Sequence, residues 1–282
     1  MNPSSAAAGL GLVSAATWGG SDFVGGLGAR RAPALLVVFA GHFFSAIVLA
    51  ALCLGARLPL PGYAALLYAG LGGFEGSLAL AVFYRALAMG SMGLTAALTG
   101  LLTALVPVGF SLGQEGLPAP LTAFGLGLGC LAIWLITHAP AARGAGSPPM
   151  ALLLGALAGT GFGAQLILFK LANTEGILWP MTSARIAGVL AMFPVLLIVR
   201  PPRGRRSGFW LTGIAAGVLD TAGNLIYLRA TQIGRLDVAA AVCSLYPAGT
   251  ILLAALLLHE RPTRRQIAGI GVALAAVALL SL

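Results

Sequence analysis

Ten long apolar segments follow one another along this chain of 282 residues. A helix needs about 20 residues to cross a hydrocarbon core of about 30 Å. Alternation of polar and apolar residues, typical of a membrane β-barrel, is absent, so we predict an all-α membrane protein with ten transmembrane helices. The expected helices are residues 5–27, 33–54, 63–88, 91–113, 119–138, 149–172, 176–199, 208–230, 237–258 and 263–282.

The composition excludes an ordinary soluble domain. Hydrophobic residues make up 59 % of the chain and charged residues 8 %, against about 25 % charged in a usual globular protein. The net charge of +9 is spread over the ends of the apolar segments, which favours anionic lipid headgroups rather than nucleic acid as the partner. The three cysteines lie in separate apolar segments without metal-ligand spacing, so we expect no metal and no cofactor.

The longest polar link divides the chain into two halves. Residues 1–138 and 149–282 each contain five expected helices, joined by a linker at 139–148. Several residues of the first half return in the second at one constant offset, among them Gly73 as Gly217 and Arg85 as Arg229. A duplicated unit with an odd number of helices must insert its second copy upside down. We therefore expect two inverted five-helix repeats, with a site near the middle of the membrane between them.

Two carboxylates lie near the middle of long apolar segments. Glu75 is surrounded by glycines and a serine, which leave room for water or a solute, and Asp220 occupies a similar place in the second half. Burial disfavours the ionised form of a carboxyl group, which suits reversible proton binding. We expect both residues to couple transport to protons or cations. The alternative is a buried, hydrogen-bonded carboxyl group with a structural role.

Other polar and aromatic residues form stripes on the expected helices. Asn224 and Tyr227 follow Asp220 at helical spacing, so the three share one face. In the first helix, Ser21 belongs to a second polar stripe, and Trp18 beside it lies far from the membrane interface where tryptophan usually gathers. Each stripe is interpreted either as a substrate-lining face or as packing between helices. Asp22 is assigned a place near the membrane boundary, paired with Arg30 or Arg31.

Arg185 and His42 occupy the middle of the seventh and second expected helices. An arginine inside the membrane needs a partner, and Glu75, Asp220 or a substrate carboxylate could supply it. A structural ion pair and a substrate contact both remain open for Arg185. His42 is either a proton relay or a hydrogen-bonded packing residue. Pro107 and Pro247 are expected to kink or break the fourth and ninth helices.

Sequence motifs of enzymes are absent. The chain contains no Walker sequence, no GxSxG elbow and no HExxH pair, so we expect neither an ATPase nor a membrane hydrolase. Arginine is concentrated in the odd-numbered links, which places these links in the cytoplasm and both termini outside.

Short segments along the chain carry a resemblance to a known family: residues 18–23 (WGGSDF), 84–87 (YRAL), 228–230 (LRA), 244–247 (SLYP) and 259–263 (HERPT). They resemble the drug/metabolite transporter superfamily, specifically its EamA-type permeases with ten helices and two internal repeats. The resemblance implies export or exchange of amino acids, metabolites or drugs, either proton-coupled or facilitative. It also implies cytoplasmic termini, against the arginine distribution, so sidedness and direction stay open.

The sequence thus predicts a secondary transporter in the bacterial inner membrane that moves a small organic solute by alternating access, as a monomer or weak homodimer. Two alternatives are a translocase for lipids or lipid-linked carriers and a non-transporting intramembrane enzyme or sensor. The predicted substrate-binding residues are Trp18, Ser21, His42, Glu75, Tyr84, Gln165, Arg185, Asp220, Asn224, Tyr227 and Tyr246.

Overall fold

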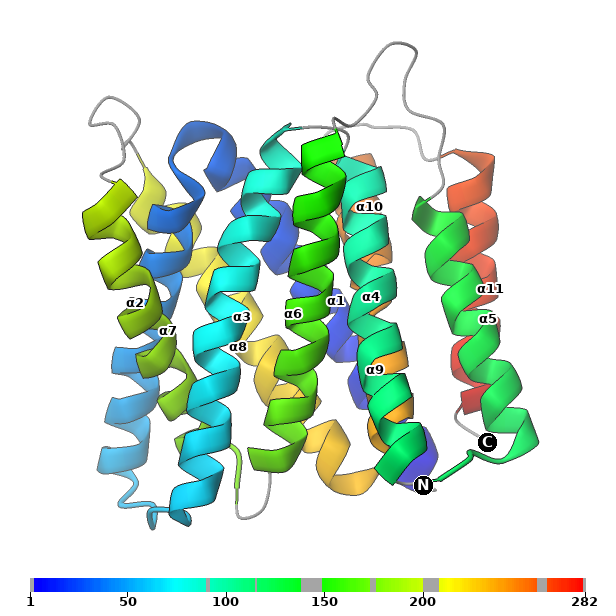
Figure 1. Ribbon diagram of the computed structural model, residues 1–282, viewed down its shortest axis with the longest axis horizontal. Coiled ribbons are helices and arrows are strands. Elements are labelled where there is room, and N and C mark those ends of the chain that lie inside the picture. Colours follow the sequence, from blue (N-terminus) through cyan, green and yellow to red (C-terminus); the bar gives the residue numbers. More distant parts are fainter. Residues whose placement is uncertain are drawn as a thin grey trace.

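The computed structural model describes residues 3–89, 92–114, 116–137, 149–172, 176–199, 208–257 and 263–280. Every regular element among these residues is a helix, so the all-α prediction is confirmed (Figure 1). The helices are α1 (Pro3–Arg31), α2 (Ala34–Gly55), α3 (Tyr63–Met89), α4 (Met92–Gln114), α5 (Pro120–Thr137), α6 (Pro149–Ala172), α7 (Leu178–Val199), α8 (Phe209–Ile233), α9 (Leu236–Cys243), α10 (Tyr246–Leu257) and α11 (Arg264–Leu280).

Proline and glycine define many of the helix ends. Pro120 and Pro149 are the first residues of α5 and α6, where the missing N–H of proline costs no helical hydrogen bond. Pro33 precedes α2, and Gly208 precedes α8 with a φ of 71°, a conformation that glycine adopts without strain. These ends lie close to those that the apolar segments predict. The expected linker at 139–148 lies outside the described residues.

The ninth expected span is divided into α9 and α10. Pro247 has no N–H to donate to the carbonyl of Cys243, and its ring would collide with that carbonyl in a continuous helix. The chain therefore leaves the helix after Cys243 and begins α10 at Tyr246. In contrast, α4 continues through Pro107 without a break.

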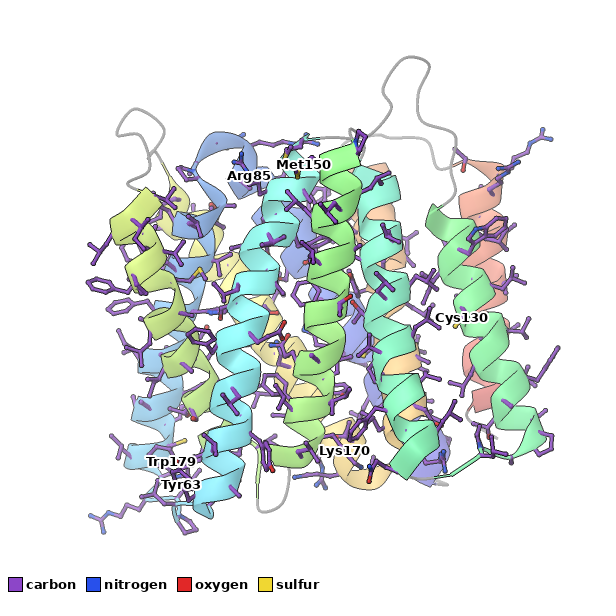
Figure 2. All side chains as sticks on the ribbon, in the orientation of Figure 1. Tyr63, Arg85, Cys130, Met150, Lys170 and Trp179 are labelled. Atoms are coloured by element: carbon purple, nitrogen blue, oxygen red, sulfur yellow. The ribbon has the colours of Figure 1, made fainter. Side chains whose placement is uncertain are left out.

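The outer surface of the bundle is apolar. Large hydrophobic side chains such as Leu190, Ile198 and Leu211 are more than half exposed, as expected for contact with lipid. Within the described residues, five helices are long and apolar enough to cross a membrane (α2, most of α3, α6, α7 and α8), and parts of α4 and α5 are shorter apolar helices. Figure 2 places Arg85 at one end of the bundle and Lys170, Trp179 and Tyr63 at the other. Cations and aromatic rings are usual at the two faces of a membrane.

The helices pair across the two halves of the chain. α1 packs mainly against α8, and α3 packs against α6 and α7. α5 packs against α11 at one edge of the bundle, while α2 and α7 lie at the opposite edge (Figure 1). In the same view α1 begins at the lower end of the bundle and α6 begins at the upper end.

Glycine allows two pairs of helices to cross at close range. A Cβ on Gly217 of α8 would overlap the backbone of Gly41 on α2. A Cβ on Gly73 of α3 would overlap the backbone of Ala184 on α7. Small residues at such crossings let membrane helices approach closely, because lipid provides no hydrophobic drive for their association.

Candidate functional site

A cavity with about 390 Å³ of empty space, open solvent included, lies between the two halves of the chain. α1, α3 and α4 line it from the first half, and α6, α8 and α10 line it from the second. Its lining residues are Trp18, Asp22, Leu80, Thr103, Phe162, Gln165, Leu166, Asp220, Asn224 and Tyr246. Most of this lining is apolar, with a few polar groups that could orient a small molecule.

Aromatic rings form one wall of this cavity. The indole of Trp18 lies edge-on to Tyr246, with 6.4 Å between ring centroids, and tilted against Tyr227 at 6.0 Å. α1 reaches the break between α9 and α10 because Gly19 packs against the backbone of Tyr246 and Gly249. Thr250 donates a hydrogen bond to the Gly19 carbonyl at 3.2 Å. These contacts fix the position of Trp18 beside the cavity.

A buried ion pair joins α7 and α8. Nη1 of Arg185 lies 2.7 Å from Oδ2 of Asp220, and the arginine side chain is 3 % exposed. A charge in so dry a place is tolerated only with an opposite charge close to it. Of the partners proposed from the sequence, the structure assigns Asp220 to Arg185.

His42 extends this pair into a hydrogen-bonded chain from α3 to α8. Ser77 donates its proton to the Gly73 carbonyl, so its oxygen accepts from Nδ1 of His42 at 2.8 Å. Nε2 of His42 lies 2.9 Å from Nη1 of Arg185, and a guanidinium can only donate. The two hydrogen bonds of His42 therefore require a neutral imidazole with its proton on Nδ1.

Asn224 holds Asp220 from within α8. Its Nδ2 donates to the backbone oxygen of Asp220 at 2.8 Å and to Oδ1 at 3.1 Å. Both partners are acceptors, so the orientation of the amide is determined. Among the described residues, the remaining Oδ1 of Asn224 has no hydrogen-bond partner although it is buried.

Asp22 corrects a sequence-based expectation. It does not lie at the membrane boundary beside Arg30 or Arg31, because α1 continues to Arg31 and Arg30 is about 12 Å further along the helix. Asp22 instead lines the cavity and is only 8 % exposed. The structure gives it no hydrogen bond or ion pair with any described residue.

A second, smaller cavity of about 200 Å³ lies beside the first, and Leu80 and Asp220 line both. Ser21, His42 and Tyr84 also line this smaller cavity. Ser21 donates to the Ala216 carbonyl at 2.9 Å, and the Tyr84 hydroxyl lies 3.5 Å from the carbonyl of Ser21. These residues hold α1 against α3 and α8 around the ion pair.

Three of the predicted substrate-binding residues line neither cavity. Glu75 is half-buried between α3 and α6, with one carboxylate oxygen against Gly161 and the other, Oε2, buried without a hydrogen-bond partner in the described part of the chain. Tyr227 is fully buried behind Trp18, and its hydroxyl donates to the Leu166 carbonyl at 3.0 Å. Arg185 is the third, and it pairs with Asp220, which lines both cavities.

The structure also adds residues that were not among the predicted site residues. Thr103 lines the cavity from α4, and Ser77 supports His42 from α3. A single hydroxyl within an apolar segment gives little signal by itself. The repeat of Thr99 and Thr103 at helical spacing was available in the sequence and marks the face of α4 that meets α6.

The second half of the chain carries the decisive similarity to a known family. Residues 149–282 match the EamA-like transporter family. The resemblance drawn from short motifs is thereby confirmed for this half, although residues 259–262 of those motifs lie outside the described residues. A solved structure described only as "Crystal structure of protein" is similar to the chain, with a TM-score of 0.76 and 17 % identity over 98 % of each chain. That likeness shows the fold. No curated protein matches the sequence.

Proposed function

We propose that this protein is a secondary transporter of the EamA kind that moves a small organic solute across the bacterial inner membrane by alternating access. The observation that carries the proposal is the cavity between the two halves, where buried polar groups and aromatic rings meet in a bundle with an apolar exterior. The match of residues 149–282 to a transporter family favours transport over catalysis.

The pairing of the helices supports an inverted repeat of residues 1–138 and 149–282. If α1 corresponds to α6, α3 to α8 and α4 to α9 with α10, the contact of α1 with α8 mirrors that of α3 with α6. The close helix crossings at glycine fit the same correspondence. Gly73 packs on α7 and its counterpart Gly217 packs on α2, which corresponds to α7.

The cavity lining is consistent with the same correspondence between the helices of the two halves. Each half contributes its first, third and fourth spans, so rocking one half against the other would open the cavity to one side of the membrane and close it to the other. The opposite starting ends of α1 and α6 support this arrangement.

Glu75 and Asp220 are proposed to couple transport to protons. Oε2 of Glu75 has no hydrogen-bond partner among the described residues, so a proton could bind there without breaking an existing contact. Asp220 is paired with Arg185, so protonating it would weaken the link between α7 and α8. Liposomes containing Glu75→Gln or Asp220→Asn should lose uptake driven by a pH gradient. Full uptake by both variants would contradict the coupling role.

A lipid translocase is less well supported. The phosphate of a lipid headgroup requires a basic pocket, whereas the charged residues that line the two cavities are Asp22 and Asp220, with the imidazole of His42 beside them. The acidic lining favours a soluble substrate.

Solute flux in proteoliposomes tests the proposed function. Gln165 lines the cavity, while Gln232 lies near the end of α8 and lines neither cavity. We expect Gln165→Ala to reduce flux of a transported solute at least several-fold and Gln232→Ala to leave it unchanged. Wild-type protein that mediates no flux across panels of cationic, neutral and anionic solutes would refute the proposal.

A further inference from the structure

The cavity contains hydrogen-bond acceptors that the protein itself leaves unused. Asp22 is 8 % exposed and lines the cavity without a hydrogen bond or ion pair to any described residue. Asn224 is 2 % exposed, and its Oδ1 has no partner within the described ranges because both donors of Nδ2 are directed at Asp220. Leaving a buried polar group unpaired costs about 1–3 kcal/mol, so such groups need a reason.

The charges around the cavity are also unequal. Asp22 and Asp220 both line it, and Asp220 is close enough to act electrostatically on Asp22. Arg185 neutralises Asp220 at 2.7 Å, while His42 is held neutral by its hydrogen bonds and adds no positive charge. Tyr84 and Tyr246, the other titratable groups near Asp22, carry no positive charge either. The Asp22 carboxyl group therefore has no cation beside it among the described residues.

The remaining lining residues indicate what kind of ligand body would fit the cavity. Trp18, Phe162 and Tyr246 offer aromatic surface, and Leu80 and Leu166 add apolar surface. Aromatic faces attract cations as well as apolar groups.

We propose that the solute is a small organic amine with an aromatic or apolar body, bound through its ammonium group by Asp22 and Asn224. This inference rests on the proposed function and names the substrate class of the same cavity. The ammonium supplies the missing positive charge to Asp22, and its N–H groups supply donors for Asp22 and for Oδ1 of Asn224. The body of the amine packs against Trp18 and Phe162.

Calorimetric titration of the purified full-length protein in detergent tests this site with three probes of one shape: phenethylamine, phenethyl alcohol and 3-phenylpropionate. We expect the wild type to bind the amine at least tenfold more tightly than the alcohol or the acid. Asp22→Asn should lose this preference, and Asp22→Glu, which retains the carboxylate, should keep most of it. Equal binding of the three probes, or an unchanged preference in Asp22→Asn, would overturn the proposal.

A second variant keeps the test informative if Asp22→Asn fails to fold. Asn224→Leu removes the unpaired Oδ1 and should weaken amine binding several-fold while thermal unfolding confirms a folded protein. Unchanged amine affinity in folded Asn224→Leu would contradict the proposed contact.

Flux of the same probes in proteoliposomes separates this inference from the proposed function. Transport of the alcohol or acid, with no binding or transport of the amine, would overturn the amine class and leave the transporter proposal standing. Amine binding that depends on Asp22, without flux of any probe, would support the site and refute transport.

Discussion

Arg185 and Asp220 form an ion pair of 2.7 Å inside an apolar bundle, and this pair links α7 to α8. His42 accepts a hydrogen bond from Arg185 and Asn224 donates one to Asp220, so four side chains from three helices are connected. Two donors of the guanidinium, Nε and Nη2, find no partner among the described residues. The Arg185 guanidinium therefore depends on Asp220 for its only opposite charge among the described residues.

Removing one member of this pair should destabilise the protein. Arg185→Met leaves Asp220 as an uncompensated buried charge, and breaking a buried pair typically costs about 3–5 kcal/mol. Thermal unfolding in detergent should show a large loss for Arg185→Met and a smaller loss for the double variant Arg185→Met/Asp220→Asn, which removes both charges. A single variant as stable as the wild type would show that the pair has no structural role.

The tautomer of His42 is a second prediction. Ser77 and Arg185 together require the proton on Nδ1, with Nε2 as the acceptor. ¹⁵N NMR of the labelled imidazole should show one protonated nitrogen, Nδ1, at neutral pH. A protonated Nε2 would contradict the hydrogen-bonded chain.

Substitution of His42 should follow the same geometry. The side-chain oxygen of glutamine can take the place of Nε2 and accept from Arg185, whereas alanine cannot. We expect His42→Gln to be more stable than His42→Ala by about 1 kcal/mol, typical for one hydrogen bond. Melting temperatures of the two variants in the same detergent measure the difference, and equal values would be inconsistent with it.

The close crossing of α2 and α8 gives a fourth prediction. A side chain on Gly217 would enter the backbone of Gly41, while Gly127 on α5 has open space around it. Gly217→Val should lose about 1–3 kcal/mol or more through overpacking, and the matched control Gly127→Val should be close to neutral. Similar melting temperatures for the two variants would argue against a tight crossing.

Trp18 provides a fifth prediction, for the cavity itself. Trp18→Ala should reduce binding of a solute that occupies the cavity at least tenfold, because the indole forms the wall beside Tyr246. Trp210 is 46 % exposed and lines neither cavity, so Trp210→Ala is the matched control. Equal loss in both variants would indicate a general effect of removing an aromatic ring.

Most of the helix positions could be predicted from the sequence, because a helix in lipid must present a long apolar run between breakers. The expected segment 149–172 has the same bounds as α6, and 33–54 differs from α2 by one residue at each end. The division of the ninth span at Ser244 and Leu245 followed from Pro247, but the continuity of α4 through Pro107 did not. A proline alone does not reveal whether a helix ends at it or continues through it.

The site was less accessible from the sequence. The spacing of Asp220 and Asn224 indicated their contact, because residues four apart share a helix face. Asp22 was assigned to the membrane boundary because the end of the first apolar run underestimates the length of α1. Glu75 looked equivalent to Asp220, yet it lies between α3 and α6. The sequence alone does not show which face of a helix meets a cavity.

Accessibility of Leu80 from the two sides of the membrane tests the central claim most directly, because this residue lines both cavities. In a variant with Cys53, Cys130 and Cys243 replaced, Leu80→Cys should react with a membrane-impermeant thiol reagent added to either side of oriented vesicles. The exposed, lipid-facing Leu190→Cys should react from neither side. Reaction of Leu80→Cys from both sides is the predicted result, and reaction from one side only would contradict alternating access.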